Sequence, residues 1–406
     1  MNLTQTDPTP RVVVVVSHPI QHFVPFYRAL AASGEIDLRV IYASRIGLER
    51  YFDRDMNTAI EWKMDLLSGY EHVFLPEAPT ITHTSPRSVY NPSIGDELAR
   101  SAPDAVLIYG YNYRTSRMAL DWCRKHRVPA IMVADSELKA PRSLLTRAVK
   151  AVVLPRVLAR FHAFVTVGDC NEDYYAHYGV PRGRMFRSPF TIDEVRYREA
   201  RARRAALRAA RREAWKVGEH ETLVLTVGKV NERKRTADVI DAAARCRDLA
   251  PANPLRFVIA GNGVEFDALT TRARAENLPV LLLGFVNVDE LPAVYAACDL
   301  IAHPSSRDPH PLVMSEAACI GLPLVVSSRV GAVGPTDIAR AGENALVFPC
   351  GEVAALAEAV GTLAEDRVRL ARMGQRSREI FDELDTARSV RGLVDAVHYC
   401  MRSAAA

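Results

Sequence analysis

Cysteine is scarce in this sequence, and the few cysteines show no paired spacing. Seven are scattered over 406 residues, at Cys123, Cys170, Cys246, Cys298, Cys319, Cys350 and Cys400. An odd and dispersed set argues against a disulfide framework and against a zinc site. We therefore expect reduced thiols in the protein core and no metal ion.

Long apolar runs are also missing. The opening segment MNLTQTDPTPRVVVVV has no basic lead-in, and its run of five valines is too short for a signal-peptide core or a membrane span. This start predicts a cytoplasmic protein.

A large excess of one charge is absent as well. The net charge is only +4, which is too small to imply a nucleic-acid partner. With 25% charged and 49% apolar residues, the chain is globular, and its length allows two cores of roughly 150 to 200 residues each. Two domains are therefore expected.

What the sequence does contain is a series of apolar runs without strict alternation, which predicts strands buried on both faces. They cover 11–16, 38–42, 105–109, 130–133 and 163–167, and then 222–227, 255–260, 280–283, 299–302, 323–327 and 345–348. Helix-length patterns such as 114–126 separate them. Strands alternating with helices predict an α/β fold with two parallel sheets, whose ligand site lies beyond the carboxyl ends of the strands.

Two carboxylates stand eight positions apart in the stretch HPSSRDPHPLVMSEAACIGLP, residues 303–323. Asp308 precedes a predicted buried helix that starts near Pro311, and Glu316 lies about one turn into it. The free amides of such a helix start attract phosphate, and a carboxylate there can accept two hydroxyls of a sugar. An ordinary helix cap with a surface acid is the equally open alternative.

A glycine turn followed by cations comes after the run 222–227. Gly228 is followed by Lys229, Arg233 and Lys234 ahead of a predicted helix, which suits a polyphosphate better than a merely solvated loop. The pair Gly261 and Gly263 lacks a third glycine at dinucleotide spacing and is weak evidence for NAD. Phe285 follows the run 280–283, where backbone groups are placed to read a nucleobase edge.

Polar residues also follow the strands of the first half. His18 and Gln21 come after the first run and either face an interdomain cleft or start a helix. Tyr111 and Asn112, after the third run, offer a platform for a sugar or an acceptor, or else form a turn. Asp135 follows the fourth run.

Asp169 follows the fifth run, and both it and Asp135 also suit a plain helix cap.

Two further segments are rich in arginine. Residues 142–160 combine an apolar stripe with cations, which is typical either of a helix on an anionic membrane surface or of a core helix with snorkelling arginines; the core helix is favoured. Residues 196–216 are interpreted as a solvated helix near the domain linker.

Taken together, the motifs VGKVNERKR, IAGNG, LLGFV and HPSSRDPHPLVMSEAACIGLPLVVS occur in an order and spacing that resemble family 4 retaining glycosyltransferases. The segments SHPIQHFVPFYRAL and WKMDLLSGY resemble bacterial members. The resemblance implies a GT-B fold of two Rossmann-like domains facing across a cleft. It implies an acceptor-binding domain at 1–195, a nucleotide-sugar-binding domain at 196–385, and a final helix at 386–406 that crosses back.

Carried over by position, the resemblance implies that Glu316 holds the ribose hydroxyls and that Asp308 contacts the donor sugar. Four positions depart from the family pattern. Asp308 replaces the usual Glu, Pro311 a common Gly and Lys229 the usual Arg, while the first-domain histidine would align around Ala134.

The candidate residues fall into three groups. The catalytic candidates are Asp308, Lys229, Lys234, His18 and Asp135. The donor-binding candidates are Glu316, Gly228, Arg233, Phe285, His310, Leu312 and Val313. The acceptor-side candidates are Gln21, Tyr111 and Asn112. Asp135, His18 or His310 is expected to take the polar role of the missing histidine.

The activity implied by the resemblance is transfer of a sugar from a nucleotide diphosphate sugar, most often a UDP-sugar, to a hydroxyl acceptor, with retention and without metal or cofactor. Its place would be the cytoplasm, with peripheral membrane contact through 142–160 as an option. Two alternatives stay open, a nucleotide-sugar epimerase and an inactive sugar-nucleotide-binding protein. The sequence carries no readable code for the donor sugar, the acceptor or the oligomeric state.

Overall fold

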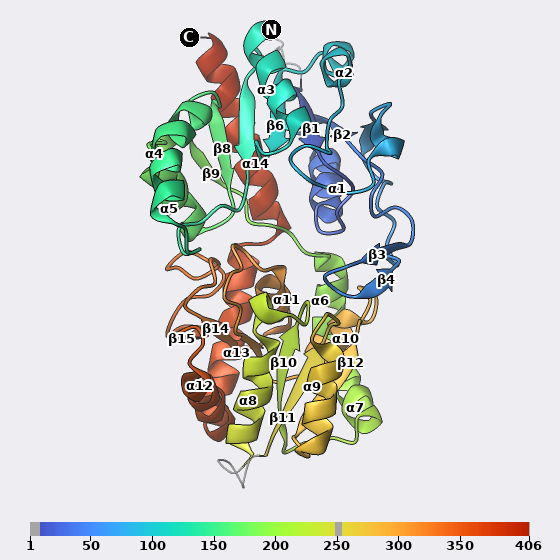
Figure 1. Ribbon diagram of the computed structural model, residues 1–406, viewed down its shortest axis with the longest axis vertical. Helices are drawn as coiled ribbons and strands as arrows, with labels where there is room; N and C mark the ends of the chain where they lie inside the picture. Colours follow the sequence, from blue (N-terminus) through green and yellow to red (C-terminus); the bar gives the residue numbers. More distant parts are fainter. Residues whose placement is uncertain (1–8, 248–253, 406) are drawn as a thin grey trace, which may run out of the picture.

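Runs of valine, isoleucine and leucine form the central strands of two parallel sheets, because branched side chains pack well on both faces of a pleated sheet. The computed structural model describes residues 9–247 and 254–405. They form two α/β domains stacked along the long axis of the molecule (Figure 1). The apolar runs of the sequence become strands, as predicted.

The N-terminal sheet has seven parallel strands in the order β5-β2-β1-β6-β7-β8-β9. Their bounds are β1 Arg11–Val16, β2 Asp37–Tyr42, β5 Glu71–Phe74, β6 Ala105–Tyr109, β7 Ala130–Val133, β8 Ala163–Thr166 and β9 Met185–Arg187. The two edge strands β5 and β9 were not predicted, because they are short and not continuously apolar.

Helices cover both faces of this sheet. They are α1 Val24–Ser33, α2 Ile94–Ser101, α3 Arg114–His126, α4 Leu144–Leu158 and α5 Asp169–His177, with short 3₁₀ turns η1 Ala78–Thr80 and η2 Arg182–Arg184. Because side chains alternate along a strand, Val12 and Val14 pack with α1, whereas Val13 and Val15 face α2, α3 and α5.

The C-terminal sheet has six parallel strands in the order β12-β11-β10-β13-β14-β15. Their bounds are β10 Thr222–Val227, β11 Leu255–Ala260, β12 Val280–Gly284, β13 Leu300–His303, β14 Leu324–Ser327 and β15 Ala345–Phe348. The helices are α6 Glu194–Ala202, α7 Arg204–Ala214, α8 Thr236–Cys246, α9 Phe266–Ala275, α10 Leu291–Ala297, α11 Leu312–Ile320, α12 Val353–Glu365 and α13 Arg367–Glu383, with η3 Glu232–Lys234.

The last helix, α14 (Thr386–Ala405), leaves the C-terminal domain and packs on β8, β9 and α1 of the N-terminal domain (Figure 1). Its Ser389 hydroxyl donates to the carbonyl of Pro189 at 2.7 Å, and Gly392 packs against the backbone of Arg187. A side chain on Gly392 would lie 2.0 Å from that carbonyl oxygen, so the close approach requires glycine.

The arginine-rich segment 196–216 is not the solvated helix that we expected. It forms α6 and α7, and Arg212 is buried with 3% exposure. Arg212 and Arg208 both pair with Asp299, at 2.6 and 2.8 Å. Arg204 and Arg208 donate to carbonyls at the end of α10, because the orphan carbonyls of a helix C-terminus attract cations.

The core-helix interpretation of 142–160 is also wrong. In α4 only Leu154 and Leu158 are buried, whereas Leu144 and Leu145 are 81% and 75% exposed. The helix extends beyond the sheet that it covers, so its first turns find no core to pack against. Within residues 9–247 and 254–405, no helix combines the length and hydropathy needed to cross a membrane.

Candidate active site between the two domains

A cavity of about 250 Å³ lies between the two domains. Its walls come from the N-terminal domain, the linker and the carboxyl ends of the C-terminal strands, as expected for open parallel sheets. The residues lining it are Gln21, His22, Met56, Trp62, Met64, Ile192, Asp193, Tyr197, Val227, Gly228, Ala260, Gly261, Phe285, Val286, Val288, Leu291, Leu312, Val313 and Glu316.

The floor of the cavity is a pair of glycine turns, one after β10 and one after β11. Gly261 has a φ of +155°, and a Cβ there would lie 1.8 Å from the carbonyl oxygen of Gly228. A Cβ on Gly263 would lie 2.2 Å from the carbonyl oxygen of Val230. The motif GNG therefore allows a close approach of two loops, which explains it without a dinucleotide.

The cations predicted to hold a diphosphate, Lys229, Arg233 and Lys234, lie on the loop after β10. Lys229 and Lys234 already have acidic partners. The Lys229 ammonium contacts both carboxylate oxygens of Asp53 at 3.1 Å and one oxygen of Asp55 at 3.1 Å. Arg233 is exposed and donates to the carbonyl of Arg307 at 2.9 Å. The Lys229 contacts join the two domains.

Asp308 accepts from two neighbours at once. Lys234 donates to one of its carboxylate oxygens, and the His303 Nε2 lies 2.9 Å from the same oxygen. Burial alone would raise the pKa of Asp308, but the hydrogen bond from His303 and the charge of Lys234 hold it well below its usual range. Burial lowers the pKa of Lys234, and the Asp308 charge opposes this. Asp308 is thus an ionised anchor for Lys234.

Glu316 lies on α11 and faces the cavity beside Leu312 and Val313. The Tyr295 hydroxyl donates to its carboxylate at 2.6 Å. Burial raises the pKa of Glu316 to about 7, while hydrogen bonds from Tyr295 and Tyr197 oppose the shift. This carboxyl group therefore changes charge near neutral pH.

Phe285 also lines the cavity, where it meets a residue of the N-terminal domain. Its ring centroid lies 6.3 Å from that of Trp62. Trp62 follows a hairpin, β3 Tyr51–Asp53 and β4 Thr58–Ile60, that was not predicted. The Asn287 amide donates to the carbonyl of Glu61 at 2.8 Å, which ties the hairpin segment to the C-terminal domain.

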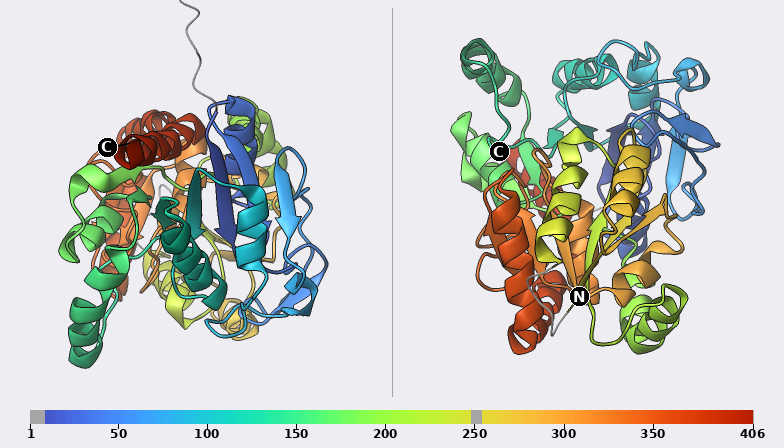
Figure 2. Two further views of the ribbon diagram at one scale, coloured as in Figure 1. Left: turned by 90° about the horizontal axis from the view of Figure 1, so that it is seen from above. Right: turned by 60° about the horizontal axis from the view of Figure 1, so that its bottom comes forward.

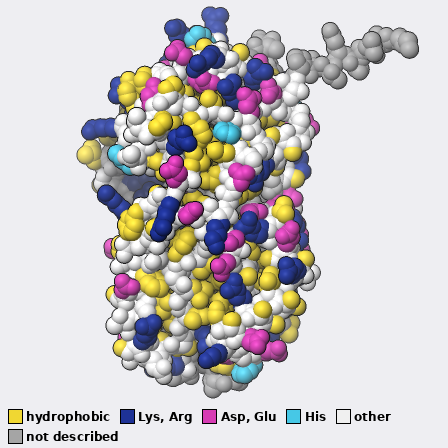
Figure 3. All heavy atoms as spheres, turned by 90° about the vertical axis from the view of Figure 1, so that its right-hand side faces the viewer, with side chains coloured by type: hydrophobic (Ala, Val, Ile, Leu, Met, Phe, Trp, Pro, Cys, Tyr) yellow, Lys and Arg dark blue, Asp and Glu magenta, His cyan; other side chains and the backbone are white. Residues whose placement is uncertain are grey.

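This crossing lies on the side of the molecule that Figure 3 presents, since β3 and β4 lie at the right of Figure 1. Lys and Arg side chains are interspersed with Asp and Glu side chains on that face. Lys63 pairs with Asp289 at 3.5 Å, which is a further ion pair between the two domains. Ion pairs therefore connect the hairpin and the residues after it to the C-terminal domain.

Of the polar residues after β1, Gln21 and His22 line the cavity, and His18 does not. The His18 Nδ1 lies 2.9 Å from the Ser17 hydroxyl, and burial lowers the pKa of His18 to about 4. Burial, together with the charge of His18, lowers the pKa of His22 to about 4 as well. Both imidazoles are therefore neutral at pH 7.

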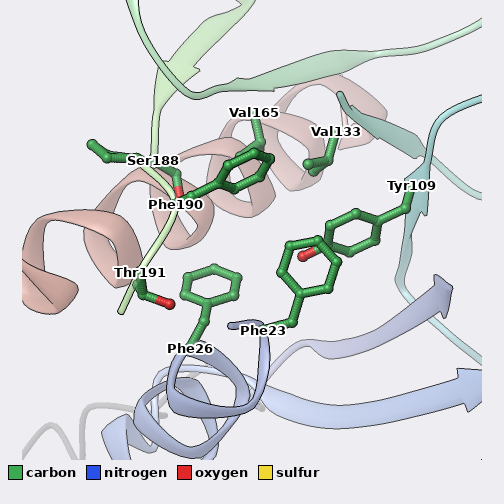
Figure 4. A pocket seen from close by; sticks show the side chains of 9 residues that line it. Phe23, Phe26, Tyr109, Val133, Val165, Ser188, Phe190 and Thr191 are labelled. Carbon is green, nitrogen blue, oxygen red and sulfur yellow. The ribbon is translucent and has the colours of Figure 1, made fainter. Parts of the chain in front are cut away.

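An aromatic cluster separates His22 from the interior of the N-terminal domain. Figure 4 shows the rings of Phe23, Phe26, Phe190 and Tyr109 turned toward one another around a small void. Its volume of about 20 Å³ leaves room for little more than one water molecule. Phe190 also contacts His22 and a residue of the other domain, His310, at ring-centroid distances of 5.7 and 5.8 Å.

Asp135 and His310 come from different domains, and His310 is one of the charged groups near Asp135. Burial raises the pKa of Asp135, which the charge of His310 opposes and the charge of Asp308 reinforces. His310 is only 6% exposed, and its Nε2 lies 3.3 Å from a carboxylate oxygen of Asp337. The polar role predicted for Asp135 or His310 stays a prediction.

The two acceptor-side candidates after β6 do not line the cavity. Tyr111 packs against the core of the N-terminal domain and interacts with the Tyr174 hydroxyl, and Asn112 is exposed. Their contact with an acceptor also stays a prediction. Asp169, expected as a helix cap, bridges the domains instead: it accepts from the amide of Thr336 at 2.9 Å.

Sequence reasoning missed several residues of the cavity wall. Tyr197 lies in a segment interpreted as solvated. Met56 lies in the turn of the β3–β4 hairpin, which has no apolar run, and Met64 follows this hairpin. His22 and Trp62 belong to the segments SHPIQHFVPFYRAL and WKMDLLSGY, but the sequence predicted no binding role for either residue. The available signal was the clustering of aromatic and sulfur-containing side chains in 51–64, which is unusual for a surface loop.

Comparisons with known proteins agree with this geometry. Residues 208–380 match the model of the family described as Glycosyl transferases group 1. A D-inositol 3-phosphate glycosyltransferase of Nocardia farcinica is 32% identical over 226 residues, which are 54% of this chain and 48% of that protein. A glycogen synthase of Mycobacterium tuberculosis is 32% identical over 158 residues, 38% of this chain and 37% of that protein. The chain thus spans about half, or less, of these relatives.

Solved structures align over nearly the whole chain. The crystal structure of Anabaena HepE in complex with UDP and glucose has a TM-score of 0.69 at 16% identity and covers 96% of this chain and 99% of that chain. Sucrose-phosphate synthase from Thermosynechococcus elongatus has a TM-score of 0.65 at 17% identity, with 98% and 100% covered. The fold prediction is confirmed. Over residues 208–380 the chain is similar to the glycosyl transferases group 1 family, and the two domains together form a GT-B fold.

Proposed function

We propose that this protein is a retaining glycosyltransferase that moves a sugar from a nucleotide diphosphate sugar to a hydroxyl acceptor. The observation that carries the proposal is the interdomain cavity, which has Glu316 on one wall, two glycine turns as its floor and a cationic loop beside it. A carboxylate suits ribose hydroxyls, glycine turns admit a close backbone approach, and cations suit a diphosphate.

The barrier to sugar transfer is mainly one of charge separation. As the glycosidic bond breaks, negative charge grows on the diphosphate, and Lys229, Lys234 and the amides at the start of α11 would stabilise it. Both lysines are already oriented by carboxylates. An incoming diphosphate would share or replace Asp53 and Asp55 at Lys229.

The proton of the acceptor hydroxyl would pass to an oxygen of the leaving diphosphate. His22 and His18 are held neutral by burial and are placed to accept hydrogen bonds rather than to supply positive charge. Glu316 would bind the ribose hydroxyls and Asp308 would hold Lys234, so neither carboxylate is assigned as a nucleophile. We assign no metal ion and no cofactor to this reaction.

We propose UDP as the nucleotide of the donor. Solved structures of Anabaena HepE contain UDP with glucose, UDP alone and UDP-glucose. The Phe285 ring and the backbone after β12 supply an apolar wall with amides for a base edge. The sugar contact assigned to Asp308 is less direct than its position suggests, because Lys234 and His303 occupy its carboxylate.

That occupation of Asp308, with the pairing of Lys229, is the observation that favours a second candidate, an inactive sugar-nucleotide-binding protein. One experiment separates the two. Panels of UDP-, GDP- and ADP-sugars are screened for a rise in melting temperature, since a ligand that binds the folded state raises its apparent stability. The binders are then incubated with simple hydroxyl acceptors.

Release of nucleoside diphosphate with formation of a glycoside of unchanged anomeric configuration is the expected result. Binding without turnover would indicate the inactive protein, and an epimerised sugar formed without acceptor would indicate an isomerase. If none of the nucleotide sugars raises the melting temperature, the proposal is wrong.

A further inference from the structure

We propose that α4 is a docking surface for an anionic lipid bilayer. The helix follows β7 and projects from the N-terminal domain in both views of Figure 2. Of its fifteen residues only Leu154 and Leu158 are buried. Apart from Val157, which packs partly against the core, its other large apolar side chains are exposed, which sets it apart from the other helices that cover the sheet.

The exposed side chains form one continuous face. Leu145, Val149, Val152 and Val153 have the spacing i, i+4, i+7, i+8, which places them on the same side of a helix. Their exposures are 75%, 53%, 58% and 51%. This face is opposite Leu154, which packs into the domain.

Leu144, in the first turn, lies about 100° around the helix from Leu145 and adds a further apolar side chain beside this face, at 81% exposure. The Ser143 side chain accepts from the amide of Thr146 at 3.2 Å and caps this turn. The exposed leucines therefore belong to a formed helix. Contiguous apolar faces of this kind are rare on soluble surfaces unless something covers them.

The charge around the face indicates what covers it. Between positions 138 and 160 the chain has six Lys or Arg residues and no Asp or Glu. Among the described residues, Arg160 pairs with Asp121, while Arg147, Lys150 and Arg156 form no ion pair. Apolar side chains flanked by unpaired cations match the acyl boundary and the anionic head groups of a bilayer.

The same charge disfavours a second copy of this chain as the occupant. A symmetric dimer brings the same patch of both subunits together. The contact would then place the cations of one α4 against those of its partner, with no acid within 138–160 to balance them. Like charges across an interface are repelled, so a bilayer fits this surface better.

The test is co-sedimentation of the full chain with vesicles at about 0.1 M salt, where charge still acts over about a Debye length. Vesicles of phosphatidylcholine with phosphatidylglycerol are compared with phosphatidylcholine alone. We expect wild type to bind the anionic vesicles on the order of tenfold more tightly. Equal binding to both, or binding to neither, would overturn the proposal.

A triple variant, Leu145→Ser, Val149→Ser and Val152→Ser, tests the apolar face. Since these side chains are exposed, the fold is expected to survive, which the melting temperature checks. Binding to anionic vesicles should fall on the order of tenfold or more. Undiminished binding by a folded triple variant would refute the assignment of α4.

The matched control substitutes three valines elsewhere that are on average more exposed, Val195→Ser, Val264→Ser and Val368→Ser, at 71%, 68% and 81% exposure. This control should bind vesicles like wild type, and a loss equal to that of the first variant would contradict the proposal. Arg147→Gln with Arg156→Gln should remove the preference for anionic vesicles.

Two further readouts identify other occupants. Sedimentation velocity without vesicles that shows a dimer lost in the α4 triple variant would assign the face to a second copy, against the proposal. Nucleotide-sugar binding should be unchanged in that variant, because α4 lies outside the cavity. The result of the vesicle experiment therefore does not depend on whether the proposed activity is correct.

Discussion

Replacing Glu316 by glutamine separates what this carboxyl group does for binding from what it does for stability. Glutamine keeps the shape and an oxygen acceptor for the Tyr295 hydroxyl, but it cannot carry charge. The pKa of Glu316 rises from its ordinary value of 4.5 to about 7 in the folded protein. At about 1.4 kcal/mol per pKa unit, that difference corresponds to about 3 kcal/mol.

The sign of the stability effect follows from this direction. Below pH 4.5 the group is protonated in both states and has no effect on folding. As the pH rises from 4.5 to about 7, the unfolded chain ionises the group and the folded protein does not, so wild type loses stability. Glu316→Gln should therefore be more stable than wild type at pH 8, by up to about 3 kcal/mol.

Glu316→Gln should weaken donor binding at pH 8, although it raises the stability of the protein at the same pH. Ribose hydroxyls donate to the ionised form, and hydrogen bonds to a charged group contribute about 1.5–3 kcal/mol, so the variant should bind a UDP-sugar about 10- to 100-fold more weakly at pH 8. Wild-type affinity should rise up to about tenfold per pH unit below pH 7 and then level off. The affinity of the variant should not follow this rise.

The assay is calorimetric titration from pH 5.5 to 8.5, with urea unfolding of both proteins over the same range. All other titratable groups are the same in the two proteins, so the difference between them isolates Glu316. Equal affinities at pH 8, or parallel pH profiles, would refute the ribose assignment. Equal stabilities at pH 8 would refute the raised pKa.

Three more variants test the cations of the site and the buried arginine cluster around Asp299. Lys234→Ala should weaken UDP-sugar binding about 10- to 100-fold in calorimetry, because a diphosphate contact is lost and Asp308 keeps its charge. Asp53→Asn with Asp55→Asn releases Lys229, so the same titration should show binding tightened up to about fivefold. Asp299→Asn leaves two arginines uncompensated and should lower the free energy of unfolding in urea by about 3–5 kcal/mol, with donor affinity unchanged.

Each has a contradicting result. Unchanged binding in Lys234→Ala would remove that lysine from the phosphate site. Weaker binding in the double asparagine variant would mean that the hairpin holds the donor rather than competing with it. A loss below about 1 kcal/mol in Asp299→Asn would show that water reaches the arginine cluster.

Much of the fold was predictable because the strands are buried on both faces and stand out as apolar runs. The strands that were missed, β3, β4, β5 and β9, are at edges or in a hairpin; each is only three or four residues long and contains at least one polar residue. The exposure of α4 was misjudged because periodicity does not reveal whether a neighbouring surface exists.

In the candidate site, too, residues in local sequence patterns were predictable, whereas contacts between distant parts of the chain were not. Gly228, Phe285 and Glu316 follow strands or start a helix, so local pattern located them, and all three line the cavity. The contact between Lys229 and Asp53 spans 176 residues and depends on how the domains meet, which no local pattern encodes. The position of Trp62 in the cavity wall could likewise not be predicted from the local sequence.

The most direct test of the account is a crystal structure of the protein with UDP. We expect the ribose hydroxyls within hydrogen-bond distance, about 2.6–3.2 Å, of the Glu316 carboxylate, and the diphosphate between the Lys229 loop and the start of α11. A nucleotide bound elsewhere, or in the cavity with Glu316 bonded only to Tyr295, would contradict the account.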